Sequence, residues 1–114
     1  MHELPVTESI LCIVLDEAKM ARAARVTRIE LTIGRLSGIV PECVQFQFDV
    51  ISQKTIAAGA TLVFNRPQAE IRCRHCRKSF LSEGFDQLIC PTCEGMHVEV
   101  LSGRELTVDA IEWE

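Results

Sequence analysis

Two C-x-x-C pairs restrict what this chain can fold into more than any other feature of its sequence. Cys73 and Cys76 form the first pair, and Cys90 and Cys93 form the second after thirteen intervening residues. Pairs at this spacing are typical of a structural zinc site, in which four thiolates surround the metal at about 2.3 Å. The metal replaces the hydrophobic core that a segment of roughly twenty residues cannot build. We therefore expect a closed zinc site without an open coordination position.

Two other arrangements of the four cysteines stay open. The first is a pair of disulfides, although a disulfide between residues three apart in the chain is strained. The second is iron bound by four thiolates in a rubredoxin-like knuckle. This strain and the cytosolic character of the chain favour zinc over disulfides, and iron is the less favoured metal.

The composition disfavours several classes of function. The chain has 114 residues and a formal net charge of −4. A general nucleic-acid binder needs a basic face, which an acidic chain does not suggest. No apolar run reaches the roughly 18 residues that a membrane span requires. The first five residues, Met-His-Glu-Leu-Pro, lack the cationic start of a secretory signal, so we expect a cytoplasmic protein.

Hydrophobic residues at helical spacing predict two helices. The first covers about residues 5–23, and the second covers about residues 41–53 and is opened by Pro41, which suits a first helical turn. Cys12 and Cys43 fall within these helices. We expect both to be buried as small apolar residues.

Alternation of apolar and polar residues predicts the strands. It indicates strands over about 26–35 and 61–66, with residues 68–71 continuing the second one toward the first cysteine pair. Further alternation covers residues 96–100 and 106–110. We expect the last strand to return to the sheet of the first two.

The order of these elements predicts an α+β fold. A small sheet of strands with two helices forms one domain, over residues 1–70 and 104–114, and a four-cysteine zinc-ribbon domain is inserted over residues 71–103. An exposed sheet edge combined with an insertion permits strand exchange between two copies, so a homodimer stays open.

Motifs spread along the chain resemble those of one family. Residues 1–4 read Met-His-Glu-Leu, residues 33–38 read Ile-Gly-Arg-Leu-Ser-Gly, and residues 102–106 read Ser-Gly-Arg-Glu-Leu. Together with the two cysteine pairs, this ordered set resembles the hydrogenase nickel-incorporation proteins, the HypA/HybF family, over the whole length of the chain. Zinc ribbons in general share the cysteines but not the other motifs.

The resemblance implies a small metallochaperone and not an enzyme. Such proteins bind Ni(II) at the amino terminus and help insert it into the large subunit of [NiFe]-hydrogenase during maturation. They work with a nickel-handling GTPase, and some members also serve urease. The domain over residues 1–70 and 104–114 then binds nickel, and the inserted domain holds structural zinc.

The implied nickel ligands are Met1, His2 and Glu3. The α-amine of Met1, the backbone nitrogen of His2 and the His2 imidazole form adjoining five- and six-membered chelate rings, which suit square-planar Ni(II). The Glu3 carboxylate completes the shell, pairs with a neighbour or caps the helix start. A departure from the family lies at Val40, near which many relatives carry an acidic residue. Glu42 either substitutes for it or interacts with the helix dipole.

Polar side chains also flank the predicted zinc site. We expect His75 and His97 to be solvated or to hydrogen-bond a thiolate. A basic run surrounds the first cysteine pair and offsets thiolate charge or, less favoured, meets an acidic partner. It comprises Arg72, Arg74, Arg77 and Lys78.

Two other functions are weighed against metal delivery. A zinc-ribbon nucleic-acid module would use the basic run with Phe80 and Phe85, but the acidic net charge disfavours it. A metalloenzyme would need a base or nucleophile beside an open metal, and the sequence suggests none.

Overall fold

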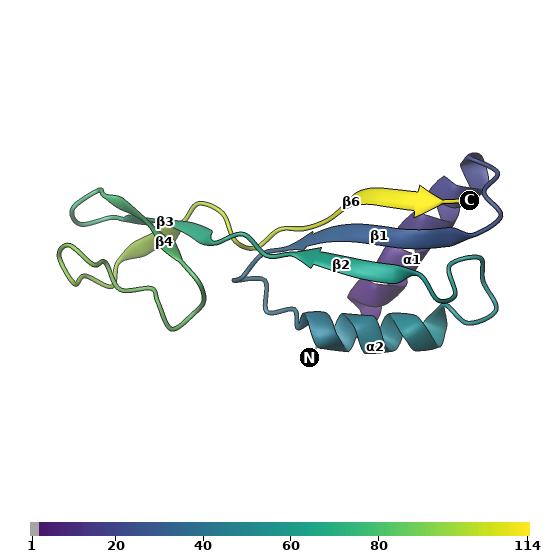
Figure 1. Ribbon diagram of the computed structural model, residues 1–114. Helices are drawn as coiled ribbons and strands as arrows, with labels where there is room; N and C mark the ends of the chain where they lie inside the picture. Colours follow the sequence, from purple (N-terminus) through teal and green to yellow (C-terminus); the bar gives the residue numbers. More distant parts are fainter. Residues whose placement is uncertain (1–2) are drawn as a thin grey trace. The chain divides into compact units, whose positions relative to one another are not determined.

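The computed structural model describes residues 3–114 and has the expected α+β fold (Figure 1). Its strands form two three-stranded sheets, ordered β2-β1-β6 and β4-β3-β5. The last strand therefore returns to the first sheet, as predicted. No helix in this described part of the chain has the length and hydrophobicity of a membrane span. In chain order the elements are α1 (Glu3–Met20), β1 (Val26–Ile33), α2 (Pro41–Ile51), β2 (Thr61–Asn65), β3 (Ala69–Cys73), β4 (Ser79–Ser82), β5 (Val98–Val100) and β6 (Leu106–Trp113).

The chain divides into two compact units. The first contains the chain up to Leu31 with Ile39–Asn65 and Thr107–Glu114, and holds both helices. The second contains Thr32–Gly38 and Arg66–Leu106, and holds the sheet β4-β3-β5. The second unit extends beyond residues 71–103 because the loop after β1 packs with it. The assignment of one metal to each unit stays a prediction.

The core of the first unit follows from the periodicity of its elements. In α1 the buried residues include Ile10, Val14 and Ala18, spaced three or four apart so that they share one helix face. They pack in one cluster with Val44 and Phe48 of α2 and with alternating residues of β1. This burial holds both helices to the sheet, because packing of an apolar face supplies most helix stability in proteins.

Several element boundaries differ from the predictions. α1 begins at Glu3 and ends at Met20, three residues earlier than predicted. The reason is a left-handed Arg22 (φ 56°), across which the Ala23 N–H bonds the Ala18 carbonyl and closes the helix. β1 ends at Ile33, α2 ends at Ile51 and β5 begins at Val98, each shorter than predicted.

The prediction that residues 68–71 continue β2 is wrong. Ala69–Cys73 forms a separate strand, β3, which pairs on one side with β4 and on the other with β5. β4 (Ser79–Ser82) was not predicted, because its four residues include two serines and the alternation is too short to detect.

The prediction that Cys12 and Cys43 are buried is also wrong, because both are exposed. Cys12 lies two residues after the buried Ile10, which places it on the far side of α1. Cys43 immediately precedes the buried Val44 of α2, outside the face that Val44 and Phe48 bury. The prediction that both cysteines lie in helices is correct, but the side of each helix on which they lie was predicted wrongly.

Candidate metal centre

Two tight turns of the same geometry carry the four clustered cysteines. In the first turn the Arg77 N–H donates to the Cys73 carbonyl at 2.8 Å, and in the second the Glu94 N–H donates to the Cys90 carbonyl at 2.8 Å. Arg77 and Glu94 have φ values of 64° and 59°. Residues other than glycine seldom adopt this left-handed conformation. Its occurrence at the same place in both turns therefore indicates that the two turns have the same functional role.

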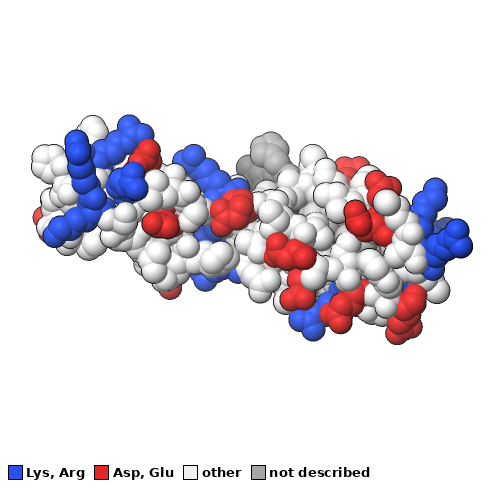
Figure 2. All heavy atoms as spheres, turned by 90° about the horizontal axis from the view of Figure 1, so that it is seen from above, with Lys and Arg blue, Asp and Glu red and all other residues white. Residues whose placement is uncertain are grey.

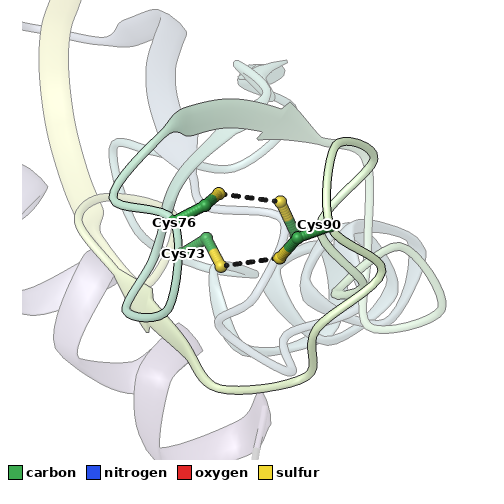
Figure 3. Close-up of side chains that lie close together, drawn as sticks. Cys73, Cys76 and Cys90 are labelled. Atoms are coloured by element: carbon green, nitrogen blue, oxygen red, sulfur yellow. Dashed lines mark hydrogen bonds between the residues drawn. The ribbon is translucent and has the colours of Figure 1, made fainter.

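The turns bring the four sulfur atoms together, as predicted (Figure 3). The Cys73 and Cys93 sulfurs lie 3.5 Å apart, those of Cys76 and Cys90 lie 3.6 Å apart, and all four lie within 4.8 Å of one another. A disulfide has an S–S distance of about 2.05 Å. Four sulfurs at about 2.3 Å from one metal ion are separated by about 3.8 Å. The donor set therefore fits one tetrahedral metal ion and not two disulfides.

Backbone N–H groups favour ionised thiols at three of the four positions, and at two of these the pKa is lowered overall. The Cys76 N–H lowers the pKa of Cys73, and the Cys93 N–H lowers the pKa of Cys90 to about 6. The Gly95 N–H lowers the pKa of Cys93, but the hydrogen bond shared with Cys73, together with burial, raises that pKa to about 12. Thiolates this close oppose one another's ionisation. A divalent cation at the centre removes this opposition, which suits a thiolate-binding metal.

Both predicted flanking histidines line one hollow beside the cluster. His75 and His97 are exposed and, with Arg74, Cys93 and Gly95, surround a volume of about 480 Å³. The Arg74 N–H donates to the His97 carbonyl at 2.8 Å, which ties the first turn to the segment leading into β5. No hydrogen bond from either imidazole to a sulfur is found among the described residues, which leaves the solvated role favoured.

Basic side chains surround the first cysteine turn. Figure 2 shows Lys and Arg gathered over the unit that contains β3 and β4. Arg72 and Arg74 lie 3.8 and 4.0 Å from the two carboxylate oxygens of Glu99. Both arginines, with Arg77 and Ser79, line a hollow that reaches Cys73. The offset of thiolate charge stays a prediction, because the ion pairs of Arg72 and Arg74 are with Glu99.

At the other predicted site, Glu3 is the residue that the structure describes. Its side chain is only 4% exposed, and its Oε2 accepts a hydrogen bond from the Val40 N–H at 3.3 Å. Met1 and His2, the other predicted nickel ligands, lie outside the described residues. Glu42 is exposed in the first turn of α2. The bond to Val40 was not predicted, because a backbone N–H leaves no signal in a sequence.

Two other motifs of the sequence lie in contact within the second unit. The Gly34 N–H donates to the Glu105 carbonyl at 2.8 Å, and the Leu36 N–H donates to the Gly103 carbonyl at 2.7 Å. A Cβ on Gly34 would lie 2.1 Å from the Gly103 oxygen. Residues 33–38 and 102–106 are therefore joined backbone to backbone, where only glycine fits.

The comparison with protein families decides the relationship of this chain to known proteins. Residues 1–113 match the family model HypA, described as "Hydrogenase/urease nickel incorporation, metallochaperone, hypA". The chain belongs to the HypA family. The resemblance seen in the sequence motifs is thereby confirmed.

Individual HypA proteins match along nearly the full chain. The hydrogenase maturation factor HypA of Dehalococcoides mccartyi (strain 195) is 44% identical over 112 residues, which cover 98% of this chain and 93% of that protein. HypA of Geotalea uraniireducens is 43% identical over 115 residues, covering all of both chains. The solution structure of the Ni metallochaperone HypA from Helicobacter pylori has the same fold, with a TM-score of 0.65, 22% identity and coverage of 99% of this chain and 97% of that one.

Proposed function

We propose that this chain is a nickel metallochaperone of hydrogenase maturation. It binds Ni(II) through Met1, His2 and Glu3 and helps insert the metal into the large subunit of [NiFe]-hydrogenase. It binds and delivers its cargo and does not catalyse a reaction. The observation that carries the proposal is the match of residues 1–113 to a nickel-incorporation family, because the match includes this amino-terminal segment.

The chemistry of the amino terminus supports nickel as cargo. An amine, a deprotonated amide and an imidazole supply three nitrogens in one plane, which Ni(II) favours. The Glu3 carboxylate, next in sequence, accepts a hydrogen bond from the Val40 N–H. A carboxylate has about four lone-pair sites, so the hydrogen bond from Val40 does not by itself prevent metal binding. Glu3 is therefore a suitable additional ligand.

The four-cysteine cluster supports a structural zinc. Its thiols lie within 4.8 Å of one another, and four thiolates leave zinc no open position for chemistry. Cys73, Cys76, Cys90 and Cys93 hold this ion and stabilise the second unit, whose buried core is small. The apolar residues buried there in one cluster are Leu36, Ala69 and Ile71, with Phe80 packed against them.

The packing of Phe80 also weakens the nucleic-acid alternative. A stacking platform for bases needs exposed aromatic faces. Phe80 is half-buried in the second core, so of the two aromatic residues named for this alternative it is Phe85, 63% exposed, that offers an open face. The proposed partners are instead the large-subunit precursor of [NiFe]-hydrogenase and a nickel-handling GTPase, in the cytoplasm. A homodimer formed by strand exchange remains part of the proposal.

The test is metal binding by untagged protein with a native amino terminus. Wild type is expected to carry about one zinc per chain as purified and to bind Ni(II) in addition. His2→Ala removes the imidazole and is expected to lose nickel while keeping zinc. His97→Ala, the same substitution beside the cysteine cluster, is the matched control and is expected to keep nickel. Unchanged nickel affinity in His2→Ala would refute the proposed site.

Delivery is tested with the same variants in a cell-free hydrogenase maturation assay. Wild type and His97→Ala are expected to support insertion of nickel into the large-subunit precursor, and His2→Ala is not. If His2→Ala binds no nickel yet supports maturation at the wild-type rate, the protein does not act by carrying nickel at this site.

A further inference from the structure

β6 is an edge strand of the sheet in the first unit. Within residues 3–114 the order β2-β1-β6 gives it a neighbouring strand on one side only, and Figure 1 shows it in yellow as an outer strand. It has 8 residues, as many as β1, and none of them is buried. Along an edge strand, every second backbone N–H and C=O points away from the sheet, where another strand can pair with it.

A groove of about 290 Å³ follows this edge. One wall is formed by Ile13 and Glu17, which lie one turn apart on α1, and the other by residues 108–111 and Trp113 of β6. Ile13 is 47% exposed and Trp113 is 43% exposed. Apolar side chains and the outer edge of β6 therefore face the same space, an arrangement that suits an added strand with side chains seated in a groove.

The charges at the groove discriminate between possible occupants. Glu17 and Asp109 line it, and β6 contains no Lys or Arg. Glu112 lies 3.2 Å from Arg28 of the neighbouring strand, so its charge is offset within the sheet. A second copy of the chain would bring its own Glu17 and Asp109 to the same edge, and like charges across a strand pair are destabilising. A segment with basic residues meets no such repulsion.

We propose that the β6 edge is the docking site for an extended segment of another protein. The segment adds as a strand beside β6, seats alternate apolar side chains against Ile13 and Trp113, and carries Lys or Arg residues that face Glu17 and Asp109. The acidic side chains that discourage pairing between copies thereby select a basic partner. This interaction involves neither metal, so it goes beyond nickel delivery and is tested separately from it.

The experiment uses the full zinc-loaded chain and three synthetic peptides. The first is acetyl-Lys-Thr-Val-Thr-Val-Thr-Lys-amide, whose Lys and Val side chains share one face of a strand. The second has Glu in place of both Lys residues, and the third is the Lys peptide with N-methyl groups along its core. Trp113 is the only Trp and the chain has no Tyr, so its emission reports on the groove directly. The Lys peptide is expected to change this emission in a saturable manner. The Glu peptide and the N-methylated peptide are expected to bind at least about tenfold more weakly.

Two pairs of variants locate the binding site. Ile13→Asp and Glu17→Lys are expected to weaken binding of the Lys peptide by about tenfold each. Val50→Asp replaces an apolar side chain of α2 that is 52% exposed, and Glu8→Lys reverses an exposed charge elsewhere on α1. These matched controls are expected to bind like wild type.

Several results would overturn the proposal. They are the absence of saturable binding, equal affinity for the Lys and N-methylated peptides, and equal losses in the groove and control variants. The other possible occupant of the groove is a second copy of the chain. Sedimentation of wild type over a range of concentrations tests for it. Dimers that Ile13→Asp dissociates would assign the groove to a second copy and refute docking of a basic partner.

Discussion

The Glu3 carboxylate and the Val40 backbone are joined by a 3.3 Å hydrogen bond, which links the start of α1 to the residue before α2. Val40 is the position near which the family resemblance implied an acidic side chain. The structure brings a carboxylate to this loop from α1 instead. The bond also supplies a partner for the Val40 N–H at a helix start that has no side-chain cap of its own.

Replacement of Glu3 separates its structural role from its proposed ligand role. Glu3→Ala removes the acceptor and is expected to lower the melting temperature by a few degrees, because the Val40 N–H is then left without it. Glu3→Gln keeps an acceptor oxygen and is expected to melt close to wild type while binding nickel more weakly. Thermal unfolding and nickel titration of both variants check this. Full nickel affinity in both would limit Glu3 to the structural role.

Removal of one clustered cysteine is expected to release the metal and unfold the second unit alone. Cys90→Ser takes one of four donors from a site whose metal stabilises a small core. Zinc content should fall far below that of wild type, while the helical circular dichroism of α1 and α2 largely persists. Cys12→Ser, at an exposed cysteine outside the cluster, is the control and should keep its zinc. Undiminished zinc in Cys90→Ser would refute the four-cysteine assignment.

The contact between Gly34 and Gly103 predicts strong destabilisation by a single methyl group. In Gly34→Ala the added Cβ meets the Gly103 oxygen at 2.1 Å, so backbone must move, at a cost of about 3 kcal/mol or more. Gly59→Ala is the contrast. Gly59 has a φ of +79° but open space around its Cβ direction, so only conformational strain of about 1 kcal/mol is expected. Denaturation midpoints of the two variants compare these costs, and equal midpoints would contradict the contact.

Local patterns in the sequence predicted most of the elements, because helices and strands are visible in the spacing of apolar residues. The spacing of Ile10, Val14 and Ala18 is an example. The cysteine cluster was predictable for a similar reason, since each pair is local and its metal chemistry is specific. Contacts that backbone groups make with residues far away in the chain could not be predicted. The bonds of Glu3 to Val40 and of Gly103 to Leu36 depend on tertiary placement, which leaves no local pattern.

The exposed cysteines show a second limit to what can be predicted from the sequence. Cys12 and Cys43 are small and weakly polar, so their chemistry permits burial. Whether they are buried depends on which side of a helix meets the sheet. That side is set by the larger residues around them, and a helix with apolar residues on a wide face leaves it ambiguous.

The proposed nickel site differs from the cysteine cluster in its sensitivity to protons. The α-amine and imidazole must lose protons to bind nickel, and their reference pKa values are about 7.7–8.0 and 6.5. Nickel is therefore expected to leave as the pH falls from about 7.5 toward 6. In the cluster the pKa of Cys90 is lowered to about 6 but that of Cys93 is raised to about 12, so these values do not decide the order of release. Zinc is expected to stay bound to lower pH because four thiolates enclose it in a closed site. Metal content after equilibration at each pH measures both.

Addition of one residue before Met1 tests the amine itself while keeping every native side chain. The extension converts the amine of Met1 into an amide and moves the new amine out of the chelate ring. It also makes His2 the third residue, where a different four-nitrogen site for Ni(II) can form. The expected result is therefore an altered nickel absorption spectrum, a shifted pH curve and impaired delivery, not the absence of binding. If the extended protein matches the native one in pH curve and in hydrogenase maturation, the amine is not a ligand and this mechanism is wrong.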